Sequence, residues 1–133
     1  MVGSDQKRST RVAESIRAEL MDLMLGGAVR DPGAVGALVS NVVVSDDLRI
    51  AKVYVRVLDT DVDKARQRAV VRAFERASGF LRREIGARVR LKYTPELRFF
   101  WDDVFDEVQQ IEALLSEVRE DARDEPADGD DDV

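Results

Sequence analysis

The most informative segment for predicting the fold is VSDDLRIAKVYVRVL, at residues 44–58. In its second half apolar residues alternate with polar ones, Arg56 among them, which is typical of a strand with one buried face. The Ser-Asp-Asp run at 45–47 favours a turn, and residues 35–44 before it are rich in β-branched side chains. We therefore predict a hairpin of strands 35–44 and 50–58 whose outer row is polar and basic.

Helical spacing of apolar residues predicts one helix before the hairpin and one directly after it. The first covers residues 12–24, with Ser9 or Thr10 as its N-cap. The second opens at Thr60, where Asp63 completes a capping box. Its apolar face carries Val62, Ala65, Ala69, Ala73 and Ala77. These small side chains predict a close approach of the helix to the sheet.

The Ala-Ser-Gly tripeptide at 77–79 interrupts this helical pattern. Because it is too short for a free loop, we predict a kink or a tight turn. A third helix then begins at Phe80, with Leu81 and Ile85 facing inward. Gly86 weakens that helix by roughly 1 kcal/mol relative to alanine, so the helix is expected to be short or bent.

Alternating apolar residues after Pro95 predict a third strand, in which Phe100 is an unexpected aromatic in the polar row. Asp102 or Asp103 is the predicted N-cap of a last, amphipathic helix. Its apolar stripe consists of Val104, Val108, Ile111, Leu115 and Val118. The order helix, strand, strand, helix, helix, strand, helix predicts an α+β domain with three strands and the helices on one side.

The composition of the 133-residue chain fits a single domain, because 44% hydrophobic residues suffice for one core. We place this folded domain at residues 9–118, after a flexible N-terminus at residues 1–8. Residues 119–133 end in DEPADGDDDV and have almost no large apolar side chains. We expect them to form a disordered acidic tail, because they bury too little surface to offset their ordering entropy.

The residue types that are absent limit the chemistry. Without cysteine or histidine, the chain can form no disulfide, no thiolate metal site and no Ser-His-Asp arrangement. No apolar run approaches the roughly 20 residues that cross a bilayer, so we expect a cytoplasmic protein, with no membrane contact and no cofactor. The cluster of Asp102, Asp103 and Asp106 resembles a carboxylate metal site, but its place before a helix is better explained by capping.

Charge is distributed unevenly along the chain. Residues 64–98 contain eleven basic and three acidic residues, a local charge of +8, although the whole chain carries −6. Residues 117–133, with nine acids and two arginines, contribute −7. This bias predicts that the two central helices present one basic flank to a polyanion. Tyr54 and Tyr93 lie beside cations and are suited either to stacking on RNA bases or to shielding a sheet edge.

Four segments are distinctive in combination. They are RVAESIRAEL at 11–20, VSDDLRIAKVYVRVL at 44–58, ASGFLRREIG at 77–86 and LKYTPELRFFWDD at 91–103. In their order and spacing they resemble the ribosome-binding factor A family, bacterial factors that assist late maturation of the small ribosomal subunit. The resemblance spans most of residues 9–118.

The resemblance implies a type II KH-like domain of order α-β-β-α-α-β, followed here by the C-terminal helix and the acidic tail. It also implies that a kink at Ala77, Ser78 and Gly79 replaces the GxxG phosphate clamp of other KH domains. The sequence Gly-Ala-Val-Gly at 33–36 also spells GxxG. Because the clamp joins two helices and this segment lies between a helix and a strand, we interpret it as a turn.

The same resemblance implies a non-enzymatic factor that binds free 30S subunits and their precursors. Contact with 16S rRNA and a role in processing its 5′ end are implied with it. Since nothing in the sequence suggests an obligate dimer, we expect a monomer. The charge pattern predicts the RNA-binding residues Arg82, Arg83, Arg88, Arg90, Lys92, Arg72, Arg76, Lys7, Arg8 and Arg11. The alternative left open is a protein–protein adaptor that uses the C-terminal amphipathic helix as a groove ligand.

Overall fold

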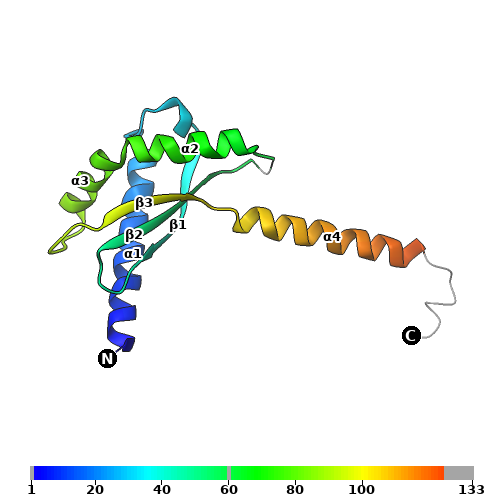
Figure 1. Cartoon of the computed structure of the whole chain (residues 1–133), viewed down its shortest axis with the longest axis horizontal. Coiled ribbons are helices and arrows are strands. Elements are labelled where there is room, and N and C mark those ends of the chain that lie inside the picture. Colours follow the sequence, from blue (N-terminus) through cyan, green and yellow to red (C-terminus); the bar gives the residue numbers. More distant parts are fainter. Residues whose placement is uncertain (1, 60, 125–133) are drawn as a thin grey trace. The chain divides into compact units, whose positions relative to one another are not determined.

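A computed structural model of the chain describes residues 2–59 and 61–124 (Figure 1). The elements are α1 (Val2–Leu25), the short 3₁₀ helix η1 (Pro32–Ala34), β1 (Ala37–Val44), β2 (Ile50–Val57), α2 (Lys64–Arg76), α3 (Ser78–Arg88), β3 (Glu96–Trp101) and α4 (Val104–Asp124). They form two compact units, one ending at Asp102 and one beginning at Asp103. The predicted α+β class is confirmed.

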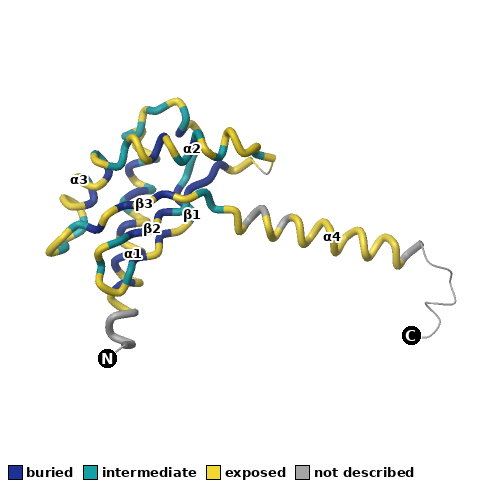
Figure 2. The backbone as a smooth tube through the Cα atoms, viewed as in Figure 1, coloured by how far each residue is buried: buried dark blue, intermediate teal, exposed yellow. Residues whose placement is uncertain are grey.

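β2 is the central strand of the sheet in the first unit. It pairs antiparallel with β1 and parallel with β3, and the parallel pair requires a crossover, which α2 and α3 form. Buried stretches run along the strands and the inner sides of the helices (Figure 2). The core joins alternate residues of the sheet to Ile16 and Leu20 of α1, Val70 and Phe74 of α2, and Leu81 and Ile85 of α3.

Arg56 of β2 departs from the predicted polar outer row, because its side chain is buried. Its guanidinium donates from Nε to the Val57 carbonyl at 3.1 Å and from Nη1 to the Asp102 carbonyl at 3.0 Å. It also lies 5.6 Å from the centre of the Trp101 ring. The expectation of an exposed Arg56 is therefore wrong, since backbone carbonyls and an aromatic ring take the place of water.

A β-bulge at Ser40 connects β1 to the end of β3. The Ser40 hydroxyl lies 3.2 Å from the Tyr54 carbonyl and donates its single proton to the charged acceptor, Asp102 Oδ2. The Ser40 carbonyl accepts from Arg17 Nε of α1 at 3.4 Å. The hydroxyl and the carbonyl of Ser40 thus both have hydrogen-bond partners outside β1.

The N-cap of α2 is Asp63, whose side chain accepts from the Arg66 N–H at 2.7 Å, while Thr60 lies outside the described residues. The predicted alanine face is only partly the core face. Val70, Ala73 and Phe74 are buried, whereas Ala65 is exposed.

The alanines of α2 instead allow η1 to approach the helix. A Cβ added at Gly33 would lie 2.9 Å from the Ala69 carbonyl oxygen and 3.3 Å from the Ala73 Cβ. Gly33 therefore fits against α2 because neither residue carries a large side chain at this contact. The small side chains of α2 thus permit a close approach of the η1 loop, where the sequence predicts a close approach of the sheet.

A single residue, Ala77, separates α2 from α3. Its backbone has φ −88° and ψ 0°, and its N–H donates to the Ala73 and Phe74 carbonyls. α3 begins at Ser78, earlier than the predicted Phe80, so Gly79 lies inside its first turn. A Cβ added at Gly79 would meet no atom nearer than 3.8 Å. The turn therefore does not depend sterically on a glycine at this position.

Gly86 neither shortens α3 nor ends it, since the helix runs on to Arg88. A Cβ added at Gly86 would lie 2.8 Å from Thr94 Oγ1. The glycine lets the segment before β3 pass close to the helix. The expectation of a shorter helix is therefore wrong.

The ends of the chain differ from the predicted boundaries. α1 begins at Val2, so Ser9 and Thr10 lie within the helix and are not its N-cap. In the second unit, α4 continues through residues 119–124 of the predicted tail, and residues 125–133 lie outside the description. The predicted apolar stripe of α4 is exposed (Figure 2). None of the helices, as far as they are described, is long and apolar enough to cross a membrane.

Candidate nucleic-acid interface

The basic residues of α2 lie on two different sides of the helix. On one side, a groove of about 240 Å³ opens between α2 and the end of β3. We call it the Trp101 groove, and it is lined by Lys64, Gln67, Arg68, Val71, Arg72, Glu75 and Trp101. None of its three cations forms an ion pair with another described residue, so their charges face the groove and solvent.

On the other side of α2, Arg66 and Arg76 contact the η1 segment. Arg66 Nη2 donates to the Val35 carbonyl at 3.2 Å, and Arg76 Nε donates to Asp31 Oδ2 at 2.7 Å. The hydrogen bond from Arg76, with a second from the Gly33 N–H, lowers the pKa of Asp31. Arg76 is therefore partly neutralised, in contrast to the neighbouring Arg72.

Arg88, near the end of α3, is surrounded by acids of two helices. Its Nη1 donates to Glu19 Oε2 at 3.1 Å and to Asp22 Oδ2 at 2.8 Å, and its Nε lies 3.7 Å from Glu84 Oε2. The pKa of Arg88 is raised chiefly by the hydrogen bond to Asp22, then by the one to Glu19. This residue ties α3 to α1, so its charge is largely balanced within the fold.

A second groove brings predicted residues from distant parts of the sequence together. Arg11 of α1 lines it with Arg88 and Arg90, over apolar residues that include Val12 and Leu91. Its volume is about 480 Å³. The sequence did not predict that α1 and the segment after α3 share a surface.

The remaining predicted cations are exposed. Arg82 donates from Nη2 to the Thr94 carbonyl at 2.9 Å, and Arg83 follows it in the first half of α3. Lys92 Nζ lies 5.7 Å from the centre of the Tyr93 ring. Lys7 and Arg8 are exposed near the start of α1. The ten predicted residues thus lie on several sides of the first unit. They do not form the single basic flank that the charge pattern predicts.

The outer face of the sheet explains the unexpected Phe100. Its ring lies 5.7 Å from that of Tyr54 on the adjacent strand, at a tilt of 32°. Cross-strand aromatic pairs of this kind stabilise a sheet. Tyr54 therefore has a structural partner on this face, whereas Tyr93 is 75% exposed.

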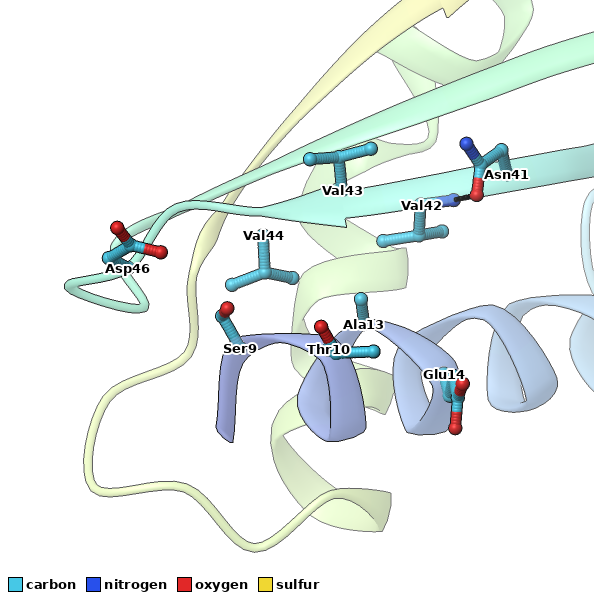
Figure 3. Close-up of a pocket in the computed structure, with 9 residues that line it drawn as sticks. All are labelled: Ser9, Thr10, Ala13, Glu14, Asn41, Val42, Val43, Val44 and Asp46. Atoms are coloured by element: carbon cyan, nitrogen blue, oxygen red, sulfur yellow. Dashed lines mark hydrogen bonds between the residues drawn. The ribbon is translucent and has the colours of Figure 1, made fainter. Parts of the chain in front are cut away.

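A third groove lies between α1 and the edge strand β1 (Figure 3). Val42 and Val44 point toward α1 and Val43 points away, while the Asn41 side chain accepts from the Val42 N–H at 2.9 Å. The charged residues among its lining residues are Glu14 and Asp46. Their negative charge is unsuited to a polyanion, so this groove does not extend the basic surface.

The acidic cluster before α4 has a structural role. The Asp102 carboxylate accepts from Ser40, and the Asp103 carbonyl accepts from the Glu107 N–H in the first turn of α4. Asp106 lies among the residues whose side chains are not described. Within the described part of the chain, no three carboxylates gather in a way that could hold a metal ion.

The comparison with protein families covers most of the chain. The sequence model of the family described as Ribosome-binding factor A matches residues 8–115. The chain belongs to the ribosome-binding factor A family. A ribosome-binding factor A from Sorangium cellulosum (strain So ce56) is 44% identical over 114 residues, which cover 86% of this chain and 90% of the relative.

Solved structures of the ribosome-binding factor A family have a similar fold. The solution NMR structure of a Thermotoga maritima protein, described as a putative ribosome binding factor A, has a TM-score of 0.59 and 32% identity, covering 70% of this chain and 85% of that one. A Thermus thermophilus RbfA homology model, fitted into a cryo-EM map of a 30S–RbfA complex, has a TM-score of 0.50 and 24% identity. It covers 71% of this chain and 91% of that one.

Sequence reasoning missed the Trp101 groove. Arg68 and Arg72 are spaced four apart, so their spacing places them on one side of a helix but does not show what that side faces. The alternation after Pro95 assigns Trp101 to a strand, but it does not place the residue beside α2, because that contact depends on the crossover. No sequence signal placed these elements side by side.

Proposed function

We propose that this chain is a non-enzymatic assembly factor that binds free 30S subunits and their precursors through 16S rRNA. In this proposal it acts as a cytoplasmic monomer, late in maturation and during processing of the rRNA 5′ end. Its first unit is a type II KH-like domain in which the turn at 77–79 takes the place of a phosphate clamp. Membership of the ribosome-binding factor A family supports this function.

The observation that carries RNA binding is the set of exposed cations that lack a described carboxylate partner. Lys64, Arg68 and Arg72 line one groove, and Arg82 and Arg83 follow on α3. Cations that are not neutralised within the fold are available for phosphates, whose contacts supply most of the affinity for nucleic acid. The Thermus thermophilus relative fitted into a 30S complex makes the small subunit the expected partner.

Co-sedimentation with ribosomal particles tests the proposal. Purified protein should sediment with free 30S subunits and not with translating ribosomes. Replacement of both Arg82 and Arg83 by glutamine should weaken this association, because two phosphate contacts are removed. An unchanged distribution for this variant would contradict binding through these residues, and equal binding of the parent protein to all particles would contradict the proposed preference for free 30S subunits.

The protein–protein adaptor is the second candidate, because the apolar stripe of α4 is exposed. This alternative predicts that truncation after Asp103 abolishes partner binding and that charge reversal at Arg82 and Arg83 does not. The assembly-factor proposal predicts the opposite result for the charge reversal. Co-sedimentation of both variants with 30S subunits therefore separates the two.

A further inference from the structure

The Trp101 groove has a chemistry that the proposed function does not specify. Its floor contains the indole of Trp101 and the side chain of Val71, both packed against the hydrophobic core. Its rim carries Lys64, Arg68 and Arg72. We propose that this groove binds one nucleotide of single-stranded RNA, with the base against the indole and the flanking phosphates at the rim. This inference rests on the proposed RNA binding.

The size of the groove suits a single ring system. Pockets for drug-sized ligands span roughly 300–1,000 Å³. The Trp101 groove, at about 240 Å³, is smaller than these. A nucleobase is flat and apolar on its faces, so its transfer from water to an apolar site beside an aromatic ring costs little free energy. A longer apolar ligand would extend beyond the groove into solvent.

The charge of the rim favours an anion on either side of that ring. Lys64, Arg68 and Arg72 are spaced four residues apart, so they lie on successive turns along one side of α2. None of them is paired with a carboxylate of the described part of the chain, and Glu75 is the acid that lines the groove with them. Successive phosphates of one RNA strand can contact all three cations, whereas a single carboxylate such as that of Glu75 cannot.

The groove lies apart from Ala77, the residue that separates α2 from α3. It follows the side of α2 from its first residue, Lys64, to Glu75, and it closes on the last residue of β3. A base bound there would fix an RNA strand at the end of the sheet. The exposed cations of α3 could then contact a following part of the same strand.

The fluorescence of the full-length chain gives a direct test, because Trp101 is its only tryptophan. Titration with a short oligoadenylate should quench the emission saturably. The Arg72→Gln variant should bind about tenfold more weakly, which corresponds to the loss of one good contact. Arg66→Gln is the matched control, because it removes the same charge from the same helix at a residue that contacts Val35 instead. Its affinity should stay close to that of the parent protein.

Substitution of the indole tests the stacking itself, with a fluorescent label on the oligonucleotide. Trp101→Phe keeps an aromatic ring and should bind nearly as well as the parent. Trp101→Leu should lose about tenfold in affinity, the size of one base–aromatic contact. If Trp101→Leu fails to fold, as judged by circular dichroism, the comparison of Arg72→Gln with Arg66→Gln still decides.

Three further results would overturn the inference. They are the absence of quenching, an equal effect of the Arg66 and Arg72 substitutions, and quenching by oligoglutamate that matches the oligonucleotide. Adenosine monophosphate should bind far more weakly than the strand, and equal affinity would make this a free-nucleotide site and overturn it as well. If 30S binding persists without quenching, only the groove inference fails; if 30S binding is also absent, the proposed function fails.

Discussion

Arg72 and Arg76 are one helical turn apart on α2, yet their electrostatic environments differ. Arg76 forms an ion pair with Asp31, whereas Arg72 faces the Trp101 groove without a carboxylate partner in the described chain. Their four-residue spacing does not show which of the two arginines is paired, because the partner of Arg76 comes from a loop 45 positions earlier. At the residue scale, the tertiary neighbour decides whether a cation is available to a ligand.

The ion pair between Asp31 and Arg76 predicts a pH dependence of stability. Because the pKa of Asp31 is lowered in the folded state, its charge stabilises the fold above the ordinary carboxyl pKa, and this contribution is lost as pH falls through the lowered value. Asp31→Asn should therefore be less stable than the parent at neutral pH. The difference between the two should close in acid. Chemical unfolding of both proteins across pH measures this, and a gap independent of pH would contradict it.

Two glycines of α3 predict opposite responses to alanine. Gly79→Ala should raise the free energy of unfolding by about 0.5–1 kcal/mol, because its Cβ would have room and alanine favours a helix. Gly86→Ala should not, since its Cβ would meet Thr94 Oγ1 at 2.8 Å. Urea unfolding of both variants tests this.

The Thr94→Ala background provides the control for the glycine pair. Without the hydroxyl, the contact at Gly86 is relieved, so Gly86→Ala should become stabilising there. If it stays destabilising in that background, the close approach of Thr94 is not the cause.

At the scale of elements, contacts across the sheet determine where each strand and helix ends. The bulge at Ser40 connects β1 to Asp102, and Arg56 of β2 donates to the carbonyl of the same aspartate. Two strands thus hold the residue that follows β3. The chain consequently leaves the sheet at a defined point, one residue before the N-terminal capping region of α4.

Removal of the Ser40 hydroxyl should destabilise the first unit by about 1.5 kcal/mol, the cost of losing a hydrogen bond to a charged group. Asp102→Asn should cost less, because the amide oxygen still accepts from Ser40. Ser15→Ala, on the exposed side of α1, is the control and should have little effect. Thermal unfolding of the three variants gives the ranking, and an equal loss for Ser40→Ala and Ser15→Ala would refute the role of the bulge.

At the scale of the whole molecule, charge is separated along the chain. The basic residues of 64–98 lie in the first unit, and residues 117–133 carry nine acids and two arginines. A field of this kind steers polyanions toward one part of a protein and repels them from another. The net charge of −6 therefore says little about which surface meets RNA.

The salt dependence of RNA binding follows from this separation. If about half of the eleven basic residues contact phosphate, log affinity should fall with log salt with a slope of about −4, at ~0.7 per contact. Arg72→Gln should reduce the slope by about 0.7. Arg76→Gln, whose charge is already balanced by Asp31, should change it less. Filter binding at several salt concentrations measures the slopes, and a slope near zero would exclude phosphate-led binding.

The acidic C-terminal residues are predicted to compete with RNA for the basic surface. Deletion of residues 120–133 removes eight acids and one arginine. RNA affinity should then rise at low salt, with the difference shrinking as salt screens the charges. Equal affinities across the whole salt series would leave the tail with no part in RNA binding.

The α+β class, the strand positions and the apolar stripe of α4 could be predicted from the sequence, because side-chain periodicity reports local geometry directly; the exposure of that stripe is a finding of the structure. The sequence also indicated the basic region, since charge counts need no coordinates. The burial of Arg56, the ion pairs of Arg76 and Arg88, and the contact of Trp101 with α2 became evident from the three-dimensional fold alone. Those outcomes depend on the parallel crossover between β2 and β3, which brings together residues that no local pattern connects.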